Sequence, residues 1–153
     1  MLTAICSDIH GNIEALDKVL KKMDELGVQR KICLGDTVGY GPNPVECLNL
    51  VLSEFDIALM GNHEQALVED NPFFNPIARA AIEWTRNRLK ENGILDSVKE
   101  LKAYHFEEDS LYVHGSNRNP ITDYVKDYDR NGLPPIEKIL NALENEFHSF
   151  SNC

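Results

Sequence analysis

Four short apolar segments of this chain each lead into a segment that combines glycine with aspartate, asparagine or histidine. Such an apolar run is typical of a short buried strand, and a glycine after it lets the backbone turn sharply. The polar segments that follow are Ser7-Asp8-Ile9-His10-Gly11, Gly35-Asp36, Gly61-Asn62-His63-Glu64 and His114-Gly115. Because ligand sites of α/β sheets lie outside the carboxyl ends of the strands, we expect the four segments to converge on one site.

The first sixty residues predict two strand–helix–strand units, and therefore a parallel sheet. Strands are expected at residues 2–7, 30–34 and 56–60. The first helix begins after the cap Asn12 and ends at Gly27, with an apolar face of Leu16, Val19, Leu20, Met23 and Leu26. Asn43 is the expected cap of the second helix, which ends near Ser53. Pro44 takes its first position and Glu46 completes a capping box.

The rest of the chain predicts helices and one hairpin. A long helix begins at Asn75-Pro76 and ends before Gly93; its apolar side is Ile77, Ala80, Ala81, Trp84 and Leu89. A short helix follows at 95–102, then a hairpin of 103–107 and 110–114 that turns at Asp109-Ser110. After a loop at 115–133, Pro134-Pro135 begins a last helix that reaches Phe147. No linker or repeat interrupts the pattern, so residues 1–153 are expected to form a single α/β domain.

Charge and composition exclude several functions. The formal net charge of −10 repels nucleic acid and anionic membranes, so neither is expected as the main partner. A small phosphate ester is compatible with this charge, because bound metal ions reverse the local sign. The chain shows neither a basic leader nor a long apolar stretch, which makes the cytosol the default compartment. Its scattered cysteines (Cys6, Cys33, Cys47 and Cys153) lack a Cys-x-x-Cys pair, and those in strands are expected to be buried thiols.

The residues at the strand ends offer oxygen and imidazole ligands without thiolate. The candidate metal ligands are Asp8, His10, Asp36, Asn62 and His114. This set suits Mn²⁺, Fe²⁺ or Zn²⁺ better than Ca²⁺. A histidine beside such a site, here His63, can protonate a leaving oxygen or stabilise pentavalent phosphorus. Glu64 reads as a first-turn helix residue favoured by the helix dipole, and His105 and His148 read as ordinary surface or core residues.

The same blocks closely resemble the successive motifs of the calcineurin-like metallophosphoesterases. Residues 39–44 and the run from Asn75-Pro76 to Trp84-Thr85 resemble the bacterial and archaeal phosphatase and phosphodiesterase branch. The resemblance implies a β-sandwich flanked by helices, with two divalent metal ions between the sheets. Mn²⁺ is the first expectation, with Fe²⁺, Zn²⁺ or Ni²⁺ as alternatives. The resemblance also implies which residues hold the two ions. Asp8, His10 and Asp36 would hold one ion, and Asp36, Asn62 and His114 the other. His63 would be the catalytic histidine.

The resemblance also has a gap. The family's Gly-His-x-His block does not occur before Cys153, since Phe147-His148-Ser149-Phe150 does not match it, so the fold is expected to be C-terminally incomplete. The first hypothesis is metal-dependent hydrolysis of a small phosphomonoester or phosphodiester. The alternatives are a metal-binding or regulatory remnant with little turnover, and a broken product without a settled fold. Sheet faces left uncovered would favour a homo-oligomer.

Overall fold

The computed structural model describes residues 1–69 and 74–123 of the chain. The predicted helix at 134–147, the end of the loop before it, and His148 and Cys153 lie outside these ranges. Within them, the helices are too short or too polar to cross a bilayer.

Three parallel strands form the central sheet. They are β1 (Thr3–Cys6), β2 (Arg30–Cys33) and β3 (Ile57–Ala58), in the order β1-β2-β3. The register pairs Cys6 with Cys33 and Cys33 with Ala58, so the carboxyl ends of the three strands lie level with one another. All three are shorter than the sequence predicted. The level ends bring the polar segments that follow to one edge of the sheet.

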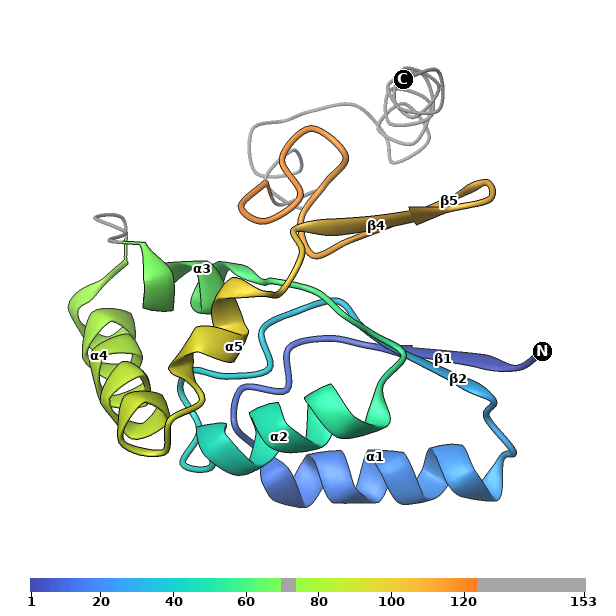
Figure 1. Ribbon diagram of the computed structural model, residues 1–153, viewed down its shortest axis with the longest axis horizontal. Coiled ribbons are helices and arrows are strands. Elements are labelled where there is room, and N and C mark those ends of the chain that lie inside the picture. The colour runs from blue at the N-terminus through green and yellow to red at the C-terminus, as the bar shows by residue number, and fades with distance from the viewer. Residues whose placement is uncertain (70–73, 124–153) are drawn as a thin grey trace, which may run out of the picture.

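Helices α1 (Ile13–Glu25) and α2 (Pro44–Glu54) cover one face of this sheet (Figure 1). Their buried side chains form one cluster with Cys33 on β2; its helical members are Leu16, Leu20, Met23, Cys47 and Val51. The Asn12 side chain accepts a hydrogen bond from the Ala15 amide at 3.0 Å, which confirms the predicted cap of α1. Gly27, with φ of 68°, follows the end of that helix as expected.

A second cluster lies beyond the strand ends, where α3 (Asn62–Val68), α4 (Pro76–Glu91) and α5 (Leu95–Lys99) pack together (Figure 1). It joins Val38 and Leu48 to buried side chains of the three helices: Ala66, Leu67, Ile82, Leu89 and Val98. This cluster supports the polar segment that begins α3.

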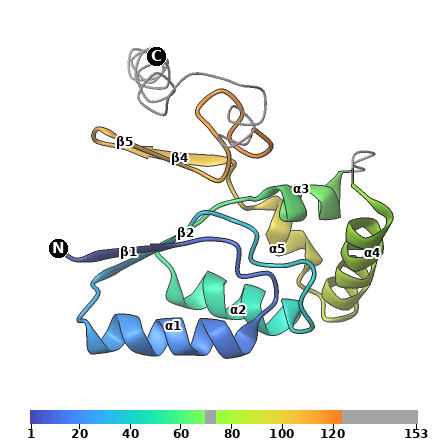
Figure 2. The same ribbon diagram turned by 180° about the vertical axis from the view of Figure 1, so that it is seen from behind.

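The hairpin of β4 (Tyr104–Glu107) and β5 (Ser110–Val113) lies on the side of the sheet opposite α1 and α2 (Figures 1 and 2). The Arg30 guanidinium on β2 donates two hydrogen bonds to the Glu107 carboxylate on β4, one of them at 2.6 Å. This bidentate pair joins the hairpin to the sheet. His114 directly follows β5, so it approaches the edge of the sheet from the side of the hairpin.

Two local predictions about turns and caps are wrong. Glu107 pairs with Ser110, so the hairpin turns at Glu108-Asp109, where Glu108 has φ of 49° as a tight hairpin turn requires. Asn43 precedes α2, but its side chain makes no capping hydrogen bond, so the predicted capping box is absent. Its φ of −119° and ψ of 55° depart from the extended conformation in which a cap side chain reaches the helix amides.

The predicted apolar face of α4 is wrong except at Leu89, which is buried as predicted. Ile77 and Trp84 are 79% and 44% exposed, whereas Ala78, Ile82, Thr85 and Leu89 are buried. The helix is rotated relative to the prediction because its partners are α2, α3 and α5, which local periodicity does not reveal.

Two isoleucines of α4 provide a matched test of this face. Ile82→Ala is expected to lower the free energy of unfolding by about 2–5 kcal/mol, because Ile82 is 4% exposed and its loss leaves a cavity. Ile77→Ala in the same helix should change it by no more than about 0.5 kcal/mol. Urea denaturation followed by circular dichroism measures both, and equal losses in the two variants would contradict the observed orientation.

Candidate functional site

The polar segments after the strands meet at one edge of the sheet. Beyond β1 and β2 the backbones continue side by side: the Asp8 amide donates to the Gly35 carbonyl at 3.0 Å and the His10 amide to the Asp36 carbonyl at 2.9 Å. Asn62 and His63 enter from the start of α3, and His114 from the end of β5. The structure thus brings together all the site residues that the sequence analysis named.

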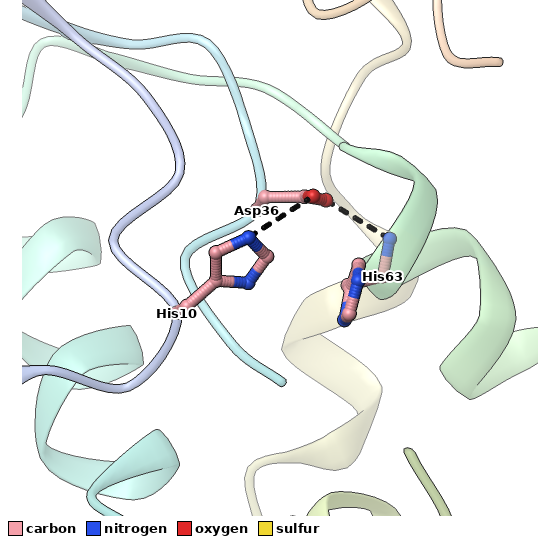
Figure 3. A group of neighbouring side chains, drawn as sticks. All are labelled: His10, Asp36 and His63. Carbon is pink, nitrogen blue, oxygen red and sulfur yellow. Dashed lines mark hydrogen bonds and ion pairs between the residues drawn. The ribbon is translucent and has the colours of Figure 1, made fainter. Parts of the chain in front are cut away.

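Asp36 lies at the centre of this group. Its Oδ2 is 3.7 Å from His10 Nε2 and 3.6 Å from His114 Nε2. Its Oδ1 accepts a hydrogen bond from the His63 backbone amide at 2.9 Å. Figure 3 shows the Asp36 carboxylate between the His10 ring and the His63 backbone. One carboxylate therefore faces the segments that follow three different strands.

The remaining candidates lie around this centre. Asp8 Oδ1 is 3.8 Å from His10 Nε2, and the Asp8 side chain is largely exposed. Asn62 Oδ1 is 3.0 Å from His114 Nε2. His63 is buried, with its ring centroid 4.7 Å from that of His10. By contrast, His105 hydrogen-bonds to Glu107 within the hairpin, in keeping with the ordinary role predicted for it.

Three of these residues have left-handed backbone conformations. Asp8, His10 and Asp36 have φ values of 59°, 49° and 53°. Such conformations cost about 1–2 kcal/mol for residues with a Cβ and persist only where surrounding contacts hold them. The hydrogen bonds between the paired loops supply those contacts. The strained conformations turn the three side chains towards one another.

Two glycines permit the close approach of the loops after β2 and β3. A Cβ on Gly35 would lie 2.5 Å from the Gly61 nitrogen, and a Cβ on Gly61 would collide with the Asp36 carboxylate. A side chain at either position would push Asp36 away from His63. Gly35 and Gly61 are therefore required because the neighbouring backbone or side chain leaves no room for a Cβ, and not only because the chain turns there.

Comparison with known proteins assigns this arrangement to a family. A model of the calcineurin-like phosphoesterases matches residues 1–150. The chain belongs to this family. It is 39% identical to a metallophosphoesterase from Sphaerobacter thermophilus, whose crystal structure superimposes with a TM-score of 0.68 over 80% of this chain and 50% of that one. The predicted metallophosphoesterase fold is confirmed.

One further solved structure agrees with the fold, and one further protein agrees in sequence. Hypothetical protein PH1004 of Pyrococcus horikoshii OT3 is 21% identical, with a TM-score of 0.70 over 80% of this chain and 58% of its own. Uncharacterized protein MJ0912 of Methanocaldococcus jannaschii is 33% identical over 137 residues, which are 82% of this chain and 56% of that protein. The chain thus spans about half the length of these relatives.

In this member of the calcineurin-like phosphoesterase family, Glu64 has a role that the sequence analysis missed. Its side chain is wholly buried and accepts hydrogen bonds from the amides of Asp36 at 2.8 Å, Val38 at 3.0 Å and Gly61 at 2.8 Å. It does lie in the first turn of α3, as predicted. The signal that was available is the acidic residue three positions after the glycine that begins the helix, which is the spacing of a capping box.

Burial shifts the pKa values of the acidic groups upwards. It raises the pKa of the Asp36 carboxyl to about 7; the amide of His63 opposes this shift, and the negative charge of Asp8 adds to it. Burial also raises the pKa of Glu64 to about 6, against the effect of its backbone donors. In residues 1–69 and 74–123, the ion-pair partners of Asp36 are His10 and His114. A buried carboxylate whose ion-pair partners there are imidazoles favours the binding of a cation.

The donor set fits divalent metal ions. His10, Asp36 and His63 form one group whose ligand atoms all lie within 4.8 Å of one another, and Asp8, Asp36 and His114 form a second. The ring nitrogens lie too far from Asp36 for hydrogen bonds but within reach of a shared cation. Asp36 belongs to both groups. His63 is a member of the first group, so its ring lies within reach of a cation bound there.

The raised pKa of Asp36 gives a pH dependence that can be measured on metal-free protein. Between pH 4 and 7 the folded state keeps a proton that the unfolded state has released, so stability falls as the pH rises. A pKa raised from 3.8 to about 7 corresponds to roughly 4 kcal/mol. Glu64 and His63 contribute shifts of opposite sign in both proteins, so the effect is measured as a difference: in chelator, the free energy of unfolding of the native protein should decrease from pH 4 to 7 by roughly 4 kcal/mol relative to that of Asp36→Asn. An equally steep decrease in the variant would contradict the shift.

Proposed function

We propose that this chain is a metal-dependent phosphoesterase whose site holds two divalent cations bridged by Asp36. The observation that carries the proposal is that Asp36 belongs to both groups of candidate ligands. Membership of the family supports the reaction class. The substrate would be a small phosphate ester, either a monoester or a diester, and Mn²⁺ would be the preferred metal. The domain would extend over residues 1–153.

The ligands divide into two sets around Asp36. As the family resemblance implies, Asp8 and His10 would complete one set, and Asn62 and His114 the other. The distances in the structure instead group His63 with His10, and Asp8 with His114, so the division between the two ions rests on the resemblance. Carboxylate, amide and imidazole donors are the ligands of borderline and hard divalent cations, which supports Mn²⁺, Fe²⁺ or Zn²⁺. When bound, such ions act as Lewis acids towards phosphoryl oxygens. The positions of the side chains are fixed in advance by the loop hydrogen bonds and by Glu64, so they need little rearrangement to bind.

His63 would face the phosphate. Burial lowers the pKa of His63 to about 4, with the neighbouring His10 and His114 adding to the decrease. A neutral imidazole is therefore its dominant form near pH 7. This supports stabilisation of the phosphoryl oxygens by a ring N–H hydrogen bond over donation of a full proton. The hydrogen bond from its backbone amide to Asp36 keeps the residue in register with the ligands.

Asp36→Asn tests the bridging role. The substitution preserves shape and the acceptor for the His63 amide but removes the charge that offsets two cations. We expect bound Mn²⁺, measured by elemental analysis after gel filtration, to fall from about two ions per chain to less than one. The control is Asp96→Asn on α5, where the carboxylate is exposed and pairs with Lys99. Equal metal content in the native protein and Asp36→Asn would exclude the bridge.

His63→Ala tests the catalytic role separately. Loss of a hydrogen-bonding or acid–base group typically costs about 10²–10⁴ in rate, so turnover of an aryl phosphate should fall by that factor while metal content stays nearly unchanged. His105→Ala in the hairpin is the matched control and should retain full activity. If His63→Ala loses its metal together with its activity, His63 is a ligand and the assignment of Asn62 fails. A native protein that binds metal without turnover would indicate a regulatory role.

A further inference from the structure

Tyr40 is a large aromatic residue held at the site but left open to solvent. It is 53% exposed, and its φ of 59° is left-handed, which is rare for a bulky side chain. It lies in the loop between β2 and α2, and neither the ligand assignment nor the role of His63 uses it.

The loop holds Tyr40 beside two histidines of the site, His10 and His63. The Gly41 amide donates to the His10 carbonyl at 2.9 Å. A Cβ on Gly39 would collide with His63 Nδ1, and one on Gly41 would collide with the His10 carbonyl oxygen. The loop is thus packed directly against both histidines. The Tyr40 ring centroid lies 4.5 Å from that of His63 and 5.0 Å from that of His10.

These contacts leave the tyrosine ring without a stacked partner in the described part of the chain. Its ring plane is inclined by 59° to His63 and by 61° to His10, so neither imidazole lies flat on it. His63 also contacts Phe74, at a centroid distance of 5.3 Å. The surrounding loop imposes backbone strain to place this ring, yet about half of the residue remains uncovered.

We propose that Tyr40 is a specificity-determining residue, whose ring stacks on a planar aromatic group attached to the phosphate of the substrate. The proposal rests on the proposed function, because it assumes that the phosphate binds between Asp36 and His63. The ligand groups of the site are polar and suited to the phosphate. Tyr40 provides the adjoining apolar surface. Stacking on such a ring contributes strongly to affinity and accepts different planar aromatic groups, because each of them has a π face.

The test uses two phosphonates that cannot be hydrolysed, so binding is measured apart from turnover. Phenylphosphonate and methylphosphonate carry the same phosphate-like group and differ in the aromatic ring. Isothermal titration calorimetry of the full chain, in the presence of Mn²⁺, should show that phenylphosphonate binds about 5- to 100-fold more tightly than methylphosphonate. This is the range of affinity that one stacked ring provides.

The variants assign this preference to the ring. Tyr40→Asn removes the ring and suits a left-handed backbone, so the preference should fall to about one while methylphosphonate binding is retained. Tyr40→Phe should keep the preference. The matched control is Tyr104→Ala, which removes an aromatic ring of similar exposure from the hairpin. If Tyr40→Asn does not fold by circular dichroism, Tyr40→Gly replaces it, since glycine has no strain there.

Several results would overturn the proposal. They are a native protein without preference for phenylphosphonate, a preference that survives Tyr40→Asn, and a Tyr40→Phe variant that loses both phosphonates equally, which would assign the phenol hydroxyl to the phosphate instead. Turnover is scored separately with phenyl phosphate and ethyl phosphate. Preferential binding that depends on Tyr40, in a protein that hydrolyses neither ester, would retain the stacking role and reject the proposed function.

Discussion

The buried carboxylate of Glu64 fixes the geometry on which the site depends. It accepts hydrogen bonds from the amides of Asp36, Val38 and Gly61, which belong to the segments after two different strands. A buried amide without a partner costs about 1–3 kcal/mol, so each of these bonds resists separation of the segments. Asp36 then accepts from the His63 amide. The backbone of the central carboxylate, Asp36, and that of the candidate catalytic residue, His63, are therefore set by one continuous hydrogen-bonded unit.

This unit works only because the backbones approach unusually closely. Gly35 and Gly61 leave no room for a Cβ, and Asp8, His10 and Asp36 adopt left-handed conformations. Strain of this kind tends to accumulate where a protein must hold groups in advance of binding. The hydrogen bonds between the paired loops and the cluster beneath α3 offset it. The strained conformations therefore reduce the stability of the fold, but they hold the polar groups together before a ligand binds.

The same compactness accounts for the electrostatics. Water is excluded from Asp36 and Glu64, so their pKa values rise, while that of His63 falls. All three shifts favour the uncharged form of each group. A divalent cation would reverse the balance at Asp36, because it stabilises the ionised carboxylate directly. The exposed side of the site is different in character, since Asp8 and Tyr40 both face solvent there.

The sequence by itself determined the α/β class, the polar segments that follow the strands and the residues that gather there, from Asp8 to His114. These features are local: an apolar run, a glycine and the polar residue beside it lie within a few positions. Only the tertiary structure decided the role of Glu64, the buried face of α4 and the placement of Tyr40 against His63. Each of these features depends on partners that are distant in the chain; Glu64, for example, accepts hydrogen bonds from Asp36 and Val38. The sequence pattern within one helix cannot specify such partners. The turn at Glu108-Asp109 was decided in the same way, because pairing across the hairpin set its register.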